Sequence, residues 1–241
     1  MSSPSKDHNN SNTLDHQDAG TEKFYGRRVG RPLRQISTDL VEKLLPSLTF
    51  DKTRNKDPHA DFDQDAKELW LEIGFGGGEH LCGQARANPQ VNFIGAEAFI
   101  NGIALILREL LESDINNIRL WPEDVRPLLD SLPENSLSRA FLLFPDPWPK
   151  IRHHKRRFVN PKNLKRLAHL IKPGGTLRIA TDHADYRQWI IDKMKANTDF
   201  KAQFQWDTLP TERPLDWVST RYESKARAQG IMCTYMDFIK K

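Results

Sequence analysis

Short apolar runs alternate with helical stretches over most of this chain, and this alternation limits the fold more than any other feature. The runs LWLEI (69–73) and VNFIGAEA (91–98) are each followed by a segment whose apolar residues recur with helical spacing, at 78–88 and 100–113. The same order repeats further along the chain. Strands that alternate with helices run parallel, and right-handed crossovers place the helices on both faces of the sheet. The sequence therefore predicts an α/β fold with a doubly wound, mostly parallel sheet.

Two further features of this sheet can be predicted. In doubly wound sheets, ligands bind in the crevice outside the carboxyl ends of the strands. The last apolar segment, IMCTYMDFIK (231–240), follows a presumed strand near Phe204 to Trp206. We expect this segment to return as a hairpin at the edge of the sheet.

Size and composition exclude several classes of protein. The chain has 241 residues, which is enough for one catalytic domain and a tail. Its two cysteines form no CxxC pair, so a disulfide framework like that of small secreted domains is excluded. No stretch approaches the ~20 apolar residues that a membrane-spanning helix needs. We therefore expect a cytoplasmic protein that is neither secreted nor inserted in a membrane.

The chain divides into three parts by composition. Residues 1–22 are polar, with almost nothing to bury, and are predicted to be a disordered tail. Residues 23–66 form a basic arm and a lead-in segment, and residues 67–241 form the catalytic domain. The basic arm, Phe24–Arg34 (FYGRRVGRPLR), contains four arginines, so it is either an extended arm for nucleic acid or a solvated linker.

A glycine-rich turn follows the first strand of the domain. Gly74, Gly76 and Gly78 form G-x-G-x-G, which allows the backbone to approach a ligand closely. Dinucleotide enzymes use the similar G-x-G-x-x-G, so the turn alone is weak evidence. Here position 79 is Glu, which breaks that spacing and would compete with a pyrophosphate at the following helix N-terminus. A cofactor without phosphate, such as S-adenosylmethionine (SAM), is favoured.

Carboxylates lie near the ends of three successive strands. Glu72 is near the end of the first, Glu97 follows the second, and Asp124 follows the third. Glu97 is placed to accept both ribose hydroxyls of a nucleoside, and Asp124 to accept a hydrogen bond from an adenine amino group. Each residue alone has another interpretation as a helix N-cap. Together with the glycine turn, the set favours a nucleoside cofactor.

The most specific stretch is FLLFPDPWPKIRHHKRRF (141–158). Pro145 and Pro147 flank Asp146 and restrict its backbone, so the carboxylate is expected to be held rigidly, as a catalytic site requires. Trp148 and a run of cations follow at once. The net charge of the chain is only +4, so it is this clustering that indicates contact with phosphates and bases. The other interpretation of the run is a solvated loop.

These motifs resemble those of the bacterial tRNA (guanine-N7-)-methyltransferase family. The segments LEIGFGGG, GAEAF, LFPDPWPK with RHHKRR, IATDHADY and TRYESKA occur in order from Leu71 to Ala226 and so span essentially the whole catalytic region. The resemblance implies a class I methyltransferase-like sheet of seven strands and SAM as cofactor. It also implies methyl transfer to N7 of a guanine in tRNA, in the variable loop. The expected partner is tRNA, with no metal and no membrane, and the chain is expected to act as a monomer or homodimer.

The resemblance also implies a role for individual residues. Asp146 would be catalytic. The cofactor would be bound by Glu72, Gly74, Gly76, Gly78, Glu97, Asp124 and Asp146. The substrate would be bound by Lys150, Asp182, Thr220, Arg221, Tyr222 and Glu223. The RNA would be contacted by Arg152, His153, His154, Lys155, Arg156 and Arg157.

Guanine itself suggests how some of these residues act. Its N1–H and N2–H2 groups are donors that Asp182 or Glu223 would accept, which favours guanine over adenine. If the base is turned out of its stack, Trp148 or Tyr222 would cover its face, while core packing is the alternative role of both rings.

Three other functions fit parts of the sequence. The α/β pattern, the glycine turn and Glu97 also suit an NAD-dependent oxidoreductase, which NADH fluorescence would detect. A PDPW-like turn also suits a SAM-dependent enzyme that methylates an exocyclic amine of another RNA base. A non-catalytic RNA-binding protein with this fold is the third alternative, and the intact set of carboxylates weighs against it.

Overall fold

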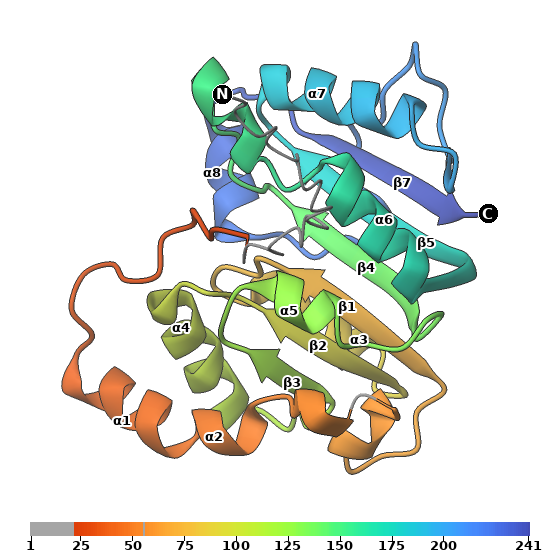
Figure 1. The fold of residues 1–241 in the computed structure, drawn as a ribbon. Helices are drawn as coiled ribbons and strands as arrows, with labels where there is room; N and C mark the ends of the chain where they lie inside the picture. The colour runs from red at the N-terminus through yellow and green to blue at the C-terminus, as the bar shows by residue number, and fades with distance from the viewer. Residues whose placement is uncertain (1–21, 55) are drawn as a thin grey trace, which may run out of the picture.

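The computed structural model describes residues 22–54 and 56–241, so the predicted disordered tail lies outside the described residues except for Glu22. The strands of the described chain form one seven-stranded sheet in the order β3-β2-β1-β4-β5-β7-β6 (Figure 1). The strands are β1 (Glu68–Ile73), β2 (Val91–Ala96), β3 (Ile118–Trp121), β4 (Leu137–Leu143), β5 (Ile171–Thr181), β6 (Phe200–Ala202) and β7 (Thr234–Lys240). Strands β1 to β5 are parallel, and β7 pairs antiparallel with both β5 and β6. The predicted doubly wound, mostly parallel sheet is confirmed.

Helices connect the strands as the alternation predicted. They are α1 (Gln35–Lys43), α2 (Leu45–Leu48), α3 (Glu79–Ala87), α4 (Ile100–Leu111), α5 (Val125–Leu129), α6 (Pro161–Leu170), α7 (Ala184–Lys195) and α8 (Arg221–Ala228). Helices α3 to α7 confirm the predicted helical segments. Helices α1, α2 and α8 were not predicted, although TRYE at the start of α8 has the pattern of a capping box. The Thr220 hydroxyl accepts a hydrogen bond from the Glu223 backbone N–H at 3.1 Å.

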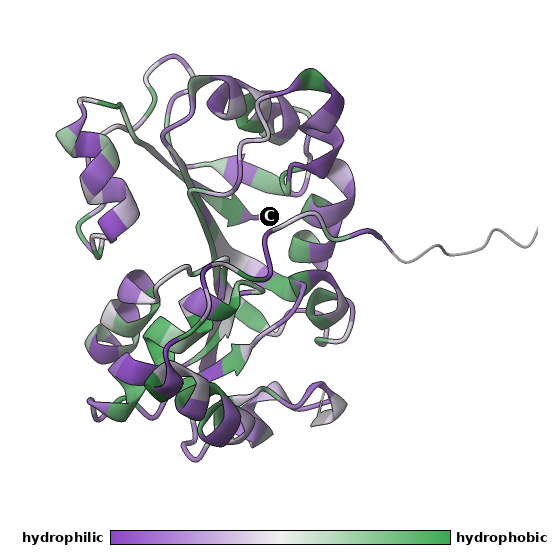
Figure 2. Cartoon of the chain, turned by 90° about the vertical axis from the view of Figure 1, so that its left-hand side faces the viewer, coloured by the Kyte–Doolittle hydropathy of each residue, from purple (hydrophilic) through white to green (hydrophobic). Residues whose placement is uncertain are grey.

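Side chains alternate along β1 between two faces of the sheet, and each face carries its own core. Leu69, Leu71 and Ile73 pack with residues of α5, α6 and α7. Trp70 points to the opposite face, where it packs on the cluster formed with α3 and α4. Figure 2 shows the sheet close to edge-on, with helices on both sides. Because strand side chains alternate with a period of two, Glu72 shares a face with Trp70 rather than with Ile73.

Two details of the sheet differ from the prediction. The strand that pairs with β7 is β6, so the prediction of a strand near Phe204 to Trp206 is wrong. These two rings instead pack against Phe238 of β7, with centroids 5.6 and 6.2 Å away. In β5, the pairing with β4 jumps between Ile171 and Thr176, because the predicted turn KPGG (172–175) bulges out of the ladder.

Candidate cofactor and substrate site

A pocket of about 570 Å³ lies at the carboxyl ends of the central strands. Gly74 follows β1, Glu97 follows β2, Asp124 follows β3, and Asp146 follows β4, and all four line the pocket. A volume of this size is typical of a small-molecule or cofactor site. The structure thus brings together most of the predicted strand-end residues in the crevice where a doubly wound sheet binds ligands.

The glycine turn has a backbone that few other residues adopt. Gly74, Gly76 and Gly78 have φ angles of +73°, +59° and +85°. The Gly76 N–H donates to the Glu97 carboxylate at 3.0 Å, so the turn is fastened to the next strand end. At Gly102 in α4, a side-chain carbon would lie 2.2 Å from the Gly76 carbonyl oxygen. Helix α4 can therefore approach the turn only because residue 102 is glycine.

Gly102→Ala is expected to destabilise the protein by about 1–3 kcal/mol, as overpacking does. In an unobstructed helix the same change would stabilise by about 1 kcal/mol, so the predicted sign reverses the ordinary one. The reason is that the added carbon meets backbone rather than a flexible side chain. Urea unfolding of the two proteins measures the difference, and an alanine variant of equal or greater stability would contradict this packing.

Glu97 is held by backbone donors on both oxygens of its carboxylate. One oxygen accepts from Gly76 N–H and the other from the Phe99 N–H at 2.8 Å. Burial raises the pKa of Glu97 in spite of these donors. A carboxylate has about four acceptor positions, so capacity remains for two ligand hydroxyls. The geometry suits the predicted contact with a ribose.

Asp124 has the helix N-cap role that the sequence left open. Its carboxylate accepts from the Arg126 N–H at 3.1 Å and pairs with the Arg126 guanidinium, whose Nη2 lies 2.6 Å away. Arg126 also lies 3.6 Å from Glu22. Although burial alone would raise it, hydrogen bonds from Lys162 and Arg166 hold the pKa of Glu22 at about 2. Asp124 both caps α5 and lines the pocket.

Glu72 does not line the pocket, in contrast to the other predicted carboxylates. It is buried on the opposite face of β1, where Oε2 lies 2.7 Å from His80 Nδ1 of α3. The alternation of side chains along the strand explains the difference. Glu72 is one residue before Ile73, which does line the pocket, and therefore points the other way.

The PDPW turn brings Asp146 to the pocket through an unusual backbone. Phe144 and Trp148, on either side of Asp146, have φ angles of +50° and +45°, a region that non-glycine residues rarely occupy. No described residue donates a hydrogen bond to the Asp146 carboxylate. Partial burial in the pocket wall raises the pKa of Asp146. The carboxylate is thus positioned through the backbone of the turn, not by hydrogen bonds of its own, and it has free acceptor capacity.

Asp146→Asn is expected to stabilise the ligand-free protein at neutral pH. A carboxyl with a raised folded-state pKa adds stability below its unfolded pKa and loses it as pH rises through the folded value. Asparagine does not ionise, so the variant does not lose stability as the pH rises. Because the group is partly exposed, we expect a gain of only about 1–2 °C in Tm at pH 7. Thermal unfolding at pH 4 to 8 should show the gain growing with pH, and a gain independent of pH would contradict the cause.

Asp182 and Tyr222 gather on the same side as Asp146. Burial, and then the nearby charges of Asp182 and Asp146, raise the pKa of Tyr222. The Tyr222 ring is 56% exposed and lies 5.4 Å from the Phe144 ring. An exposed aromatic face beside two carboxylates is suited to a base with donor groups. Lys150, also predicted to bind substrate, is exposed at the start of the short helix 151–156.

The remaining substrate candidates have structural partners. Glu223 is fully buried, and its carboxylate accepts from Arg213 Nε at 2.6 Å, from Trp217 Nε1 at 2.8 Å and from the Tyr235 hydroxyl. The structure therefore does not place it where a base would reach it. Thr220 caps α8, and exposed Arg221 lies 2.6 Å from Glu79 at the start of α3.

The basic run divides into exposed and buried members. Arg152 and Lys155 are exposed. The Arg156 guanidinium lies 4.5 Å from the Tyr25 ring and 4.9 Å from the Trp148 ring. His153 contacts the Trp148 ring, and His154 the Trp189 ring. Arg157 is 1% exposed, so the prediction that it contacts RNA does not fit its position, because its guanidinium is enclosed by protein groups.

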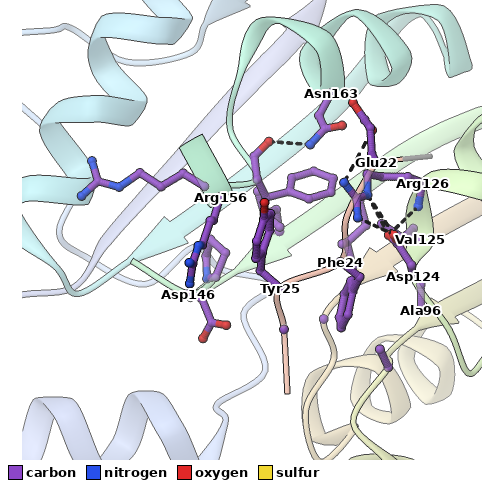
Figure 3. A pocket seen from close by; sticks show the side chains of 18 of the residues that line it. Glu22, Phe24, Tyr25, Ala96, Asp124, Val125, Arg126, Asp146, Arg156 and Asn163 are labelled. Carbon is purple, nitrogen blue, oxygen red and sulfur yellow. Dashed lines mark hydrogen bonds and ion pairs between the residues drawn. The ribbon is translucent and has the colours of Figure 1, made fainter. Parts of the chain in front are cut away.

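The sequence did not indicate that Glu22 and the basic arm line the pocket. Phe24 and Tyr25 project from the arm, with Asp146 on one side and Asp124 on the other (Figure 3). The arm is fastened to α4, since the Ile100 N–H donates to the Arg28 carbonyl at 3.0 Å and the Gly30 N–H donates to Asn101 at 2.9 Å. The sequence did offer one signal for this: Phe24 and Tyr25 are two adjacent aromatic residues in an otherwise polar segment.

The described residues contain neither a metal-binding cluster nor a membrane-spanning helix. Within residues 22–54 and 56–241, no group of three or more His, Cys, Asp or Glu side chains could hold a metal ion. In the same ranges, every helix is too short or too polar to cross a bilayer.

The strand order, the glycine turn and the pocket beside it define a class I SAM-dependent methyltransferase. A solved variant of the 16S rRNA (adenine(1408)-N(1))-methyltransferase from Catenulisporales acidiphilia, with cosubstrate SAM, has the same fold. Its TM-score is 0.52 at 16% identity, over 79% of this chain and 91% of that chain. The family model described as "Putative methyltransferase" matches residues 66–235.

Curated relatives identify the family more closely. The tRNA (guanine-N(7)-)-methyltransferase of Rhodospirillum rubrum is 45% identical, over 91% of this chain and 88% of its own. That of Ruegeria pomeroyi is 44% identical, over 92% and 95%. The chain belongs to the tRNA (guanine-N(7)-)-methyltransferase family. The predicted cofactor, SAM, is confirmed, and the NAD-dependent alternative is excluded.

Proposed function

We propose that this enzyme methylates N7 of a guanine in the variable loop of tRNA. One observation carries the proposal: the pocket that holds Glu97 and Asp124 also holds Asp146, next to Asp182, Tyr222 and an exposed cationic segment. A cofactor site and a site for a guanine base thus meet at one carboxylate. The relatives that the chain resembles are named for methyl transfer to N7 of a guanine in tRNA, and the variable loop is the finer part of the proposal.

The pocket residues fit the cofactor by their chemistry. SAM supplies an activated methyl group on a sulfonium. Glu97 retains acceptor capacity for hydroxyl groups, and the glycine turn leaves space beside it, because a side-chain carbon at Gly74 or Gly76 would meet nothing within 4 Å. We propose that Gly74, Gly76, Gly78, Glu97, Asp124 and Asp146 hold it. Glu72 lies on the opposite face of β1 and contributes indirectly: its carboxylate holds His80 at the start of α3, the helix that follows the glycine turn.

The chain's part in catalysis is mainly positioning. Guanine N7 carries a lone pair and no proton, so no side chain has to act as a base. Positive charge develops on the purine ring during the transfer, and the Asp146 carboxylate, which has no donor among the described residues, stabilises it. The rigid turn matters because a fixed charge needs no reorganisation at the moment of reaction.

The neighbouring residues explain the choice of guanine. Asp182 accepts from N1–H and N2–H2, donors that adenine does not present together. Tyr222, exposed and adjacent, stacks on the base once it is turned out of the RNA. Glu223, the other acceptor considered, instead holds Trp217 and Tyr235 in place beneath this surface.

The exposed cations hold the RNA itself. Lys150, Arg152 and Lys155 are exposed, so their side chains are able to meet phosphates. Arg156 lines the pocket and lies over the rings of Tyr25 and Trp148. We further propose that the enzyme works in the cytoplasm as a monomer or homodimer. Sedimentation equilibrium checks the second point, and a larger assembly would contradict it.

The position of the methyl group tests the proposal. Unmodified tRNA is incubated with the protein and labelled SAM, and nuclease digests are analysed by mass spectrometry. The expected product is 7-methylguanosine from the variable loop. A matched tRNA with 7-deazaguanosine at that position lacks only the reacting nitrogen and should accept no methyl group. Methylation of the 7-deaza substrate would favour an exocyclic amine instead and overturn the proposal.

A further inference from the structure

The catalytic turn needs support from outside itself. Phe144 and Trp148 both have positive φ angles, which side-chain-bearing residues adopt only where their surroundings hold them. Asp146, between them, receives no hydrogen bond from any described residue. The position of its carboxylate therefore depends on whatever fixes the backbone of the turn.

Arg157 makes such a contact. It is 1% exposed, and its Nε donates to the Pro147 carbonyl oxygen at 2.8 Å, one residue beyond Asp146. Its Nη2 donates to the carboxylate of Asp185 in the first turn of α7. One planar guanidinium thus joins the turn to a helix through two directed hydrogen bonds, a geometry that the rigid donor fork of arginine allows.

The guanidinium is held on its other sides as well. It lies 5.1 Å from the ring centroids of both Tyr186 and Trp189 in α7. Trp189 in turn donates to the Val159 carbonyl oxygen at 2.6 Å, and the Tyr186 hydroxyl accepts from the Val159 N–H at 3.2 Å. Arg157 thus packs against two aromatic rings of α7, and these rings are themselves hydrogen-bonded to the segment that follows the basic run.

We infer that Arg157 and Asp185 are a positioning pair, which anchors the PDPW turn to α7 and holds Asp146 in its reactive place. The inference rests on the proposed function and deepens it. The basic run then has two separate roles. Its exposed cations bind RNA, and Arg157 holds the catalytic turn without touching the substrate.

Asp185→Asn tests the pair with little risk to folding, since the Asp185 side chain is 56% exposed. The expected result is about a tenfold lower kcat, as a small misplacement of a reacting group produces, with KM for tRNA and for SAM changed less than about twofold. Asp185→Glu, which keeps the charge, should recover most of the loss. The matched control is Asp192→Asn on the same helix. Among the described residues, only Gln188 donates a hydrogen bond to the Asp192 carboxylate, so this variant should leave kcat unchanged.

A second readout does not depend on methyl transfer. With 5-fluorotryptophan incorporated, the Trp148 resonance is assigned through Trp148→Phe and compared by fluorine NMR in the variants. The inference predicts that this resonance shifts or broadens in Asp185→Asn and not in Asp192→Asn. An unchanged resonance, or equal kcat for the two asparagine variants, would overturn the pair. Failure of the proposed function is separate, because it would show as wild-type enzyme that forms no 7-methylguanosine.

Discussion

Asp146→Ala is expected to lower kcat for methyl transfer by about 10²–10³-fold, the usual loss when a preorganised electrostatic group is removed. The expectation rests on the position of the carboxylate, which lines the pocket and receives no hydrogen bond from the described residues. Its charge is therefore free to stabilise the positive charge that develops on guanine. Single-turnover assays with saturating SAM and unmodified tRNA measure the effect.

A control variant at a second acidic residue distinguishes the loss of the Asp146 function from the mere loss of one negative charge. Asp114 is exposed beyond the end of α4, next to the segment that leads into β3 and away from the strand ends that form the pocket. Asp114→Ala should retain the wild-type rate. If Asp146→Ala transferred methyl groups at near-normal rate with unchanged affinity for SAM, the catalytic role of Asp146 would be rejected.

Arg152→Gln combined with Lys155→Gln is expected to weaken tRNA binding by more than about tenfold at low salt. Each lost phosphate contact should also lower the slope of log K against log[salt] by about 1, so the double variant loses about 2. Both side chains are exposed, unlike Arg157, so their removal should not disturb the turn. Filter binding over a salt series gives affinity and slope together.

The control for this prediction removes two positive charges at another place in the molecule. Lys201 lies on β6, the edge strand of the sheet, and Lys240 lies near the end of β7, which pairs with β6. Their double glutamine variant should bind tRNA as the wild type does, and both double variants should keep their affinity for SAM. If the two double variants had equal salt slopes, the proposal that Arg152 and Lys155 contact the RNA would be contradicted.

The sheet and the strand-end carboxylates could be predicted because they follow from local patterns. Alternating apolar runs and helical spacing determine which segments form strands, and parallel strands bring their carboxyl ends together. Glu97 directly follows the end of β2, and Asp146 comes three residues after the end of β4, so their place in the pocket was already implied by the order of elements. The helix cap at Asp124 was also among the predicted possibilities.

Other residues could not be placed because their environment depends on distant segments. Glu72 is one position away from a pocket residue, and the alternation of the strand turns it toward His80. Arg157 belongs to a run of cations in sequence, yet Asp185, Tyr186 and Trp189 from α7 enclose it. Composition shows a charge but not which residues surround it in the fold.

A crystal structure of the protein with S-adenosylhomocysteine is the most direct measurement of how the pocket works. We expect the ribose hydroxyls within hydrogen-bonding distance of the Glu97 carboxylate, the adenine beside Asp124, and the sulfur on the side of Asp146. A nucleoside bound away from these three residues, or a pocket kept closed by Phe24 and Tyr25 at saturating ligand, would contradict the assignment of this crevice as the cofactor site.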